Sequence, residues 1–90
     1  MLINGFDWDS VNLEHINGHR IQNYEVEEAM LFDKPIYQKG KGGVFIAFAI
    51  AENGRYLFIV FKCKGKGLIR VITERGMIGR EKHSYRRRAR

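Results

Sequence analysis

The spacing of apolar residues along the chain changes at Pro35. Before it, apolar residues recur every three or four positions, which predicts two amphipathic helices, within residues 8–19 and 22–33. After it, long runs rich in β-branched and aromatic residues predict strands. Pro35 separates the two regions because it cannot continue a helix and biases the residue before it toward extended geometry.

The first predicted helix has recognisable ends. Asp9 can accept hydrogen bonds from the backbone N–H groups of Val11 or Asn12, and Gly18 suits the C′ position. The expected apolar edge of this helix consists of Val11, Ile16 and Leu13. The expected buried stripe of the second helix consists of Val26, Ala29, Met30 and Phe32.

The strand region predicts an antiparallel meander. Residues 44–51 and 55–63 are joined by Asn53-Gly54, the strongest short hairpin signal, and a second tight turn at residues 64–67 leads into a strand over residues 68–74. Ile36 and Tyr37 add a short fourth strand. The near-continuous apolar character of the two long runs predicts central strands with both faces at least partly covered.

A last helix is predicted over residues 79–88, with Glu81 in its first turn and Tyr85 four residues later on the same face. The order of elements predicts a single α+β domain over residues 1–90. In it, a sheet of three to four antiparallel strands packs with two N-terminal helices and one C-terminal helix. The chain begins with nothing like a signal peptide, and its longest apolar run is too short to span a bilayer, so we expect a cytoplasmic protein.

Charge is distributed unevenly along these 90 residues. The net charge is +6, but residues 1–33 carry seven acids and one base, whereas residues 34–90 carry fifteen bases and three acids. This split predicts an acidic face and a basic face. A basic face of this density favours nucleic acid, anionic lipid or an acidic protein as partner.

Few of the other residues suggest chemistry. Cys63 is the single cysteine, so an intrachain disulfide is excluded, and its place in a strand predicts a buried or half-buried thiol. His15 and His19 have the spacing of two ligands on one helix face, but no third ligand and no HExxH motif accompany them. We therefore expect no metal and no cofactor, and keep His19 as a candidate proton-transfer group. The glycine-rich segments "KGKGG" and "KGKG" lack the features of a P-loop and are interpreted as turns.

Four residues near the C-terminus suit the cleavage of RNA through its own 2′-OH. That reaction needs a base, a cation for the charge on the phosphorane, a proton donor for the 5′ oxygen, and alignment. Arg70 and Arg75 can clamp the phosphate, Glu81 can act as the base or orient an arginine, and Tyr85 can donate a proton or stack on a base. Alternatively, Glu81 caps the helix or pairs with Arg75, and Tyr85 packs on the sheet.

Several motifs, in order, resemble the BrnT toxin family: "FDWD" followed by an Asn and two His, then "EVEEAM", "GRYLFIVF" and "IRVITERGM…REKHSYRRR". The resemblance spans essentially the whole chain. It implies a ribonuclease toxin with a RelE-like fold, produced beside a DNA-binding antitoxin, with two copies of each in the complex. The family's arginine pair falls on Arg70 and Arg75, its glutamate on Glu81 and its tyrosine on Tyr85. Glu74 departs from the family pattern and places an anion beside Arg75.

The function expected from the sequence is a metal-independent endoribonuclease toxin of a type II toxin–antitoxin pair, which cleaves RNA by 2′-OH transesterification. The alternative is a module of the same fold that binds RNA or its antitoxin without turnover. A third class, a small DNA-binding regulator, is disfavoured because no recognition helix is evident. The candidate catalytic residues are Arg70, Arg75, Glu81, Tyr85 and His19. The candidate RNA-binding residues are Lys62, Lys64, Arg80, Lys82, Arg86 and Arg87. The antitoxin is expected to cover Arg70, Arg75 and the basic tail, residues 86–90.

Overall fold

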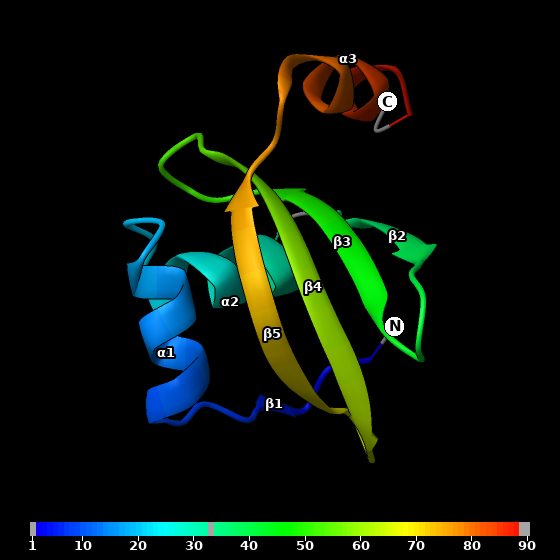
Figure 1. Cartoon of the computed structure of the whole chain (residues 1–90). Coiled ribbons are helices and arrows are strands. Elements are labelled where there is room, and N and C mark those ends of the chain that lie inside the picture. The colour runs from blue at the N-terminus through cyan, green and yellow to red at the C-terminus, as the bar shows by residue number, and fades with distance from the viewer. Residues whose placement is uncertain (1, 33, 89–90) are drawn as a thin grey trace.

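The computed structural model describes residues 2–32 and 34–88, and Figure 1 shows their arrangement. Within these residues the chain forms three helices and five strands. In chain order they are β1 (Gly5–Phe6), α1 (Ser10–Asn17), α2 (Asn23–Phe32), β2 (Ile36–Lys39), β3 (Phe45–Ile50), β4 (Tyr56–Gly65), β5 (Leu68–Gly76) and α3 (Gly79–Arg88). The predicted α+β class is confirmed. None of the described helices has both the length and the apolar character needed to cross a membrane.

The sheet is mixed rather than purely antiparallel. Its strand order is β1-β5-β4-β3-β2; β2 to β5 form the antiparallel meander, and β1 lies parallel to β5. The expectation of three to four antiparallel strands was therefore incomplete. Gly5 and Phe6 are too few to give a periodic signal, and they become a strand only because backbone hydrogen bonds join Asn4 to Gly67 (2.8 Å) and Asp7 to Ile69 (2.8 Å).

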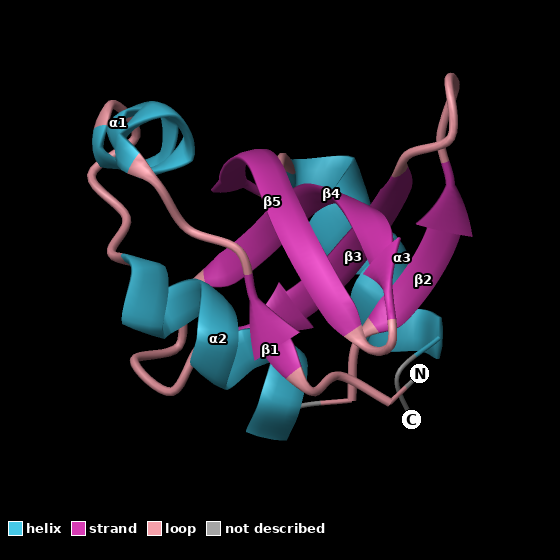
Figure 2. Ribbon diagram, turned by 90° about the horizontal axis from the view of Figure 1, so that it is seen from below, coloured by secondary structure: helices cyan, strands magenta, loops and turns pink. Residues whose placement is uncertain are grey.

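The two long apolar runs form β3 and β4, which lie inside the sheet as predicted. Helices α1 and α2 lie on one face of the sheet (Figure 2). The core on this side contains the fully buried residues Ile16, Val26, Leu57, Ile59 and Phe61. The opposite face is half-buried and meets α3 where the strands end (Figure 1). The sheet therefore has one closed face and one partly open face.

The N-terminal end of α1 matches the sequence prediction, whereas its C-terminal end and its buried face differ. Asp9 accepts hydrogen bonds from the backbone N–H groups of Val11 (3.0 Å) and Asn12 (3.2 Å). Gly18 was expected at C′, yet it is the C-cap with an ordinary helical φ of −59°, and the positive φ falls on Arg20 instead. Val11 is exposed, not part of the apolar edge. Asn12 is buried in its place. Its side-chain amide donates hydrogen bonds to two backbone carbonyls, and these compensate for the loss of water.

Two further burial predictions were wrong. Phe32, at the end of α2, is 77% exposed, and the face of α2 that packs on the sheet includes the buried acid Glu25. Glu25 is tolerated there because it accepts hydrogen bonds from Asn53 (2.9 Å) and Arg55 (3.2 Å). Cys63 is exposed, because it lies in the last four residues of β4, all of which are exposed.

Candidate functional site

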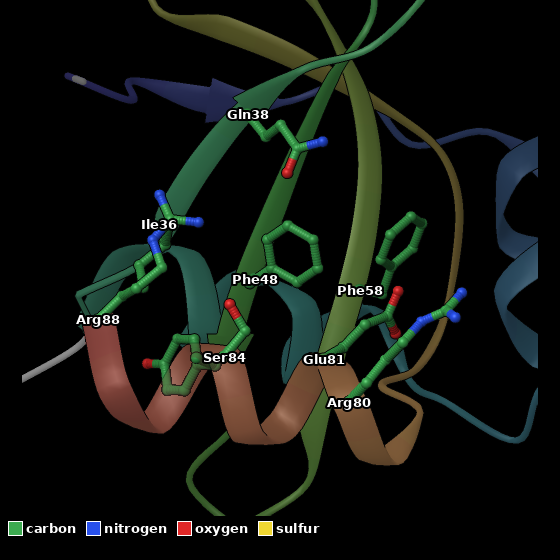
Figure 3. Close-up of a pocket in the computed structure, with 9 residues that line it drawn as sticks. Ile36, Gln38, Phe48, Phe58, Arg80, Glu81, Ser84 and Arg88 are labelled. Atoms are coloured by element: carbon green, nitrogen blue, oxygen red, sulfur yellow. The ribbon is translucent and has the colours of Figure 1, made fainter.

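A groove lies between α3 and the partly open face of the sheet (Figure 3). Its volume is about 360 Å³. The sheet contributes Ile36, Gln38, Phe48 and Phe58, and the helix contributes Arg80, Glu81, Ser84, Tyr85 and Arg88. Phe48 and Phe58 are paired across β3 and β4 and meet edge to face, with their ring centroids 5.3 Å apart. The groove therefore has an aromatic floor and a charged wall.

Arg75 lies beside this groove and contacts two of the residues that line it, Phe58 and Glu81. It is the cross-strand neighbour of Phe58, and its guanidinium lies 3.8 Å above the centroid of that ring. Its Nη1 and Nη2 atoms donate to the two carboxylate oxygens of Glu81 at 2.8 and 2.9 Å. Because a bidentate pair and a cation–π contact both restrict the planar group, Arg75 has a fixed orientation.

Glu81 links Arg75 to the start of α3. Its Oε1 atom also accepts a hydrogen bond from the backbone N–H of Ile78 (2.9 Å), the residue that precedes the helix. The hydrogen bonds from Arg75, assisted by that of Ile78, lower the pKa of Glu81. The structure thus confirms two of the roles considered from the sequence: Glu81 caps the helix and it orients Arg75.

Arg75 retains capacity for a ligand. Its Nη1 atom donates to the Gly76 carbonyl oxygen (2.9 Å) and to Glu81, and its Nη2 atom donates to Glu81. These bonds use three of the five guanidinium N–H donors. The other two, on Nε and Nη2, make no hydrogen bond within the described part of the chain. With its side chain 38% exposed, Arg75 can donate both to a phosphate oxygen.

Arg70 does not join this cluster. It lies five residues before Arg75 on β5, a separation of roughly 16 Å at ordinary strand spacing. Its guanidinium instead pairs with Asp7 (3.3 Å) and Asp9 (2.9 Å), and this contact lowers the pKa of Asp9. The two arginines therefore do not form one clamp around a single phosphate, because the strand between them holds them apart.

Glu74 does not place an anion beside Arg75. Successive residues on a strand point to opposite faces, so Glu74 points to the side of α1 and α2, where it is 1% exposed. Burial raises the pKa of Glu74 to about 8, against a smaller opposing effect of Arg55. Neither of its carboxyl oxygens has a hydrogen-bond partner among residues 2–32 and 34–88. The expectation drawn from the sequence was wrong because it ignored the alternation of the strand.

Tyr85 and His19 have different surroundings. Tyr85 is buried in the wall of the groove, on the same face of α3 as Glu81, as predicted. Its ring packs edge to face on Tyr56, with the centroids 6.0 Å apart. His19 is exposed in the turn after α1, where its backbone N–H donates to Ile16. His19 is not among the residues that line the groove, and Figure 1 shows α1, the helix before it, beside β5 and well separated from α3.

The candidate RNA-binding residues occupy two regions. Arg80 lines the groove, and Lys82 and Arg86 lie above the Tyr56 ring, 5.6 and 5.1 Å from its centroid. Arg87 is exposed on the same helix. Lys62 and Lys64 are exposed on the distal half of β4. Arg70 of β5 lies opposite Lys62 in the strand register. The end of the basic tail, residues 89–90, lies outside the described residues.

The sequence interpretation missed the floor of the groove. Neither Phe48 nor Phe58 was singled out, although a signal for both was present. The Asn53-Gly54 turn sets the register of β3 against β4, and counting back from it pairs Phe48 with Phe58 on the face that the buried alanines avoid. Gln38 and Ser84 gave no such signal, because only the packing of α3 brings them near each other.

No family model matches the chain, and neither a curated protein nor a solved structure matches it significantly.

Proposed function

We propose that the chain is a metal-independent endoribonuclease toxin of the BrnT type with a RelE-like fold, and that RNA binds in the groove under α3. The observation that supports this most is that the Arg75 guanidinium is held in one orientation and keeps N–H donors for a ligand. The group is fixed by Glu81 and Phe58, two residues that line the groove, and two of its N–H donors make no hydrogen bond within the described residues. Such a preorganised cation suits the charge that develops on a phosphorane.

In the proposed reaction the 2′ oxygen attacks the adjacent phosphorus and the bond from phosphorus to the 5′ oxygen breaks. The 2′ proton is lost, the 5′ oxygen gains a proton, and the products end in a 2′,3′-cyclic phosphate and a 5′-OH. Arg75 stabilises the charge on the phosphorane oxygens, and Glu81 is a positioning residue for Arg75. Tyr85 lines the same groove, so of the predicted proton donors it, rather than His19, belongs to this site.

A second function, RNA binding without turnover, is favoured by one observation. Glu81 was considered from the sequence as the base or as the orienter of an arginine, yet both of its oxygens accept hydrogen bonds from Arg75 and its pKa is lowered. A carboxylate in this state is a weak base. The two functions have the same site and differ only in whether a bound RNA is cut.

The test is incubation of the purified protein with single-stranded RNA in EDTA. The toxin proposal expects fragments with 2′,3′-cyclic phosphate ends, and their loss in Arg75→Ala. Arg20→Asn is a matched control, because it removes an exposed arginine away from the groove and asparagine tolerates the positive φ of that position. Stable RNA binding without fragments, again lost in Arg75→Ala, would support the second function.

We also propose an acidic antitoxin as the protein partner, in a complex with two copies of each chain. The basic residues of α3 have few acidic neighbours, whereas Arg70 is already paired with Asp7 and Asp9. The antitoxin is therefore expected to cover the groove and α3 rather than Arg70. Its association rate should fall between 50 mM and about 500 mM salt, because screening shortens the range of attraction. A rate that is indifferent to both salt and Arg87→Glu would contradict this partner.

A further inference from the structure

The groove has more space and more chemistry than a phosphate on Arg75 requires. Its volume of about 360 Å³ lies within the range of roughly 300–1,000 Å³ that is usual for sites of small organic ligands. One face of the Phe58 ring is already covered by the Arg75 guanidinium. Phe48 and Ile36 are half-buried beside it and supply the remaining apolar floor. A flat, apolar group fits such a floor.

Two uncharged polar side chains face this floor from opposite sides. Gln38 extends from β2 and Ser84 from α3, and Figure 3 shows both side chains directed into the space around Phe48. Neither makes a hydrogen bond within the described residues. An amide and a hydroxyl each both donate and accept, whereas a phosphate offers acceptors only. This pair therefore suits a ligand whose edge carries donors and acceptors together.

Cations flank the groove. Arg80 and Arg88 both line it from α3, eight residues apart, which is about 12 Å along a helix axis. Arg75, stacked on the Phe58 ring, adds a third cation beside the groove. Positive charge thus lies on either side of the apolar floor, as expected for a flat polar ring attached to a backbone that is negatively charged in both directions.

We propose that this groove is a subsite for one unstacked nucleobase of single-stranded RNA. The base packs on Phe48, Gln38 and Ser84 bind its hydrogen-bonding edge, and the flanking phosphates lie against Arg75 and the arginines of α3. The inference rests on the proposed RNA-binding function and adds base selectivity to it. Gln38 and Ser84 are the residues that determine this selectivity.

The chain offers matched controls for a test. Gln38 and Ser84 each have one counterpart of the same type, Gln22 and Ser10, both exposed and outside the groove. Fluorescence anisotropy would measure the dissociation constants of labelled oligo-A, oligo-C, oligo-G and oligo-U for Gln38→Leu, Ser84→Ala, Gln22→Leu and Ser10→Ala. If cleavage interferes, oligonucleotides with 2′-O-methyl groups keep the base edges and prevent the attack.

We expect wild-type protein to prefer one base by about tenfold, and Gln38→Leu to reduce this ratio to threefold or less, while the two controls keep it. Phe48→Leu should weaken binding of all four by about five- to tenfold through lost stacking, at the lower end of the range for a stacked base. Circular dichroism confirms that this half-buried variant folds.

Three other outcomes have distinct meanings. If wild-type protein binds none of the four RNAs, the proposed function itself fails. If it binds them and Arg75→Ala weakens binding, but Gln38→Leu behaves as Gln22→Leu does, the RNA site stands and the base subsite is wrong. If RNA binding is insensitive to Gln38→Leu and Phe48→Leu while both weaken binding of an acidic antitoxin, the groove is a protein-binding site and the inference is likewise overturned.

Discussion

Glu74 and Arg75 are neighbours in the sequence, yet their side chains lie on opposite faces of the sheet. Arg75 stacks on Phe58 beside the groove, and Glu74 is buried toward α1 and α2, where no described residue forms a hydrogen bond with its carboxyl group. One strand position thus separates a preorganised cation from an acid that is kept neutral by burial. Arg75 therefore bears on the proposed RNA site, whereas Glu74 bears on the stability of the fold.

Because Glu74 is buried, we expect the free energy of unfolding to fall as the pH rises. Burial raises its pKa from 4.5 to about 8 in the folded chain, so the folded state holds a proton that the unfolded state loses. The free energy of unfolding should therefore decline between about pH 4.5 and pH 8, by up to roughly 1.4 kcal/mol for each pH unit. Arg55 and Glu25, the charged groups that act on Glu74, oppose and reinforce this effect respectively.

Urea denaturation at several pH values would measure this decline. Glu74→Gln should remove most of it, because a glutamine does not ionise, and should be more stable than wild type at pH 8. Glu14→Gln, at an exposed position of α1, is the control. Parallel curves for Glu74→Gln and wild type between pH 5 and pH 8 would show that Glu74 does not stay protonated in the folded chain.

Arg75 and Arg70 should respond differently to the same substitution. Arg75→Lys loses the bidentate contact with Glu81 and the stacking on Phe58, so RNA cleavage should fall by about 100-fold or more. Arg70→Lys keeps a cation near Asp7 and Asp9, and it should leave cleavage close to wild type with a stability loss below about 1 kcal/mol. Equal losses of cleavage in the two variants would place both arginines in one site, against the observed geometry.

Glu81→Gln tests whether Glu81 positions Arg75 or takes a proton. The amide can still accept from the Ile78 N–H but lacks the charge that pairs with Arg75, so we expect a stability loss of about 1–2 kcal/mol at neutral pH. Because pairing lowers the pKa of Glu81, this loss should shrink as the pH falls through that lowered value. Residual cleavage should keep the pH profile of wild type. Disappearance of an acidic limb from the profile would identify Glu81 as the base.

We expect Asn12 to contribute more to stability than an ordinary polar residue of a surface helix, because its side chain is buried and hydrogen-bonded. Its Nδ2 atom donates to the carbonyls of Asp7 (2.8 Å) and Val71 (3.0 Å), and its Oδ1 atom accepts from the Asp9 N–H (2.7 Å). Asn12→Ala leaves these buried groups unpaired and should destabilise the chain by about 2–4 kcal/mol. Asn17→Ala, at the exposed end of α1, is the matched control in thermal unfolding. A loss as small as that of the control would mean that water replaces the amide.

Local patterns predicted most elements, whereas contacts between distant segments decided what the sequence interpretation missed. The Asn53-Gly54 hairpin, the Asp9 cap and the helix over residues 79–88 depend on neighbours in the chain, and all three are confirmed. The pairing of Arg70 with Asp7 joins residues 63 positions apart and has no local signal. The same holds for the groove, because Gln38 and Ser84 approach each other only through the packing of α3.

The parallel pairing of β1 with β5 also constrains the order in which the protein can be assembled during synthesis. Gly5 and Phe6 find their partners only when Leu68 and Ile69, 63 residues further along the chain, have left the ribosome. Closing so long a loop is slow compared with forming the meander. The groove follows later still, since Glu81 and the rest of α3 are made after β5. A growing chain therefore contains its core residues before the groove, the proposed RNA site, can form.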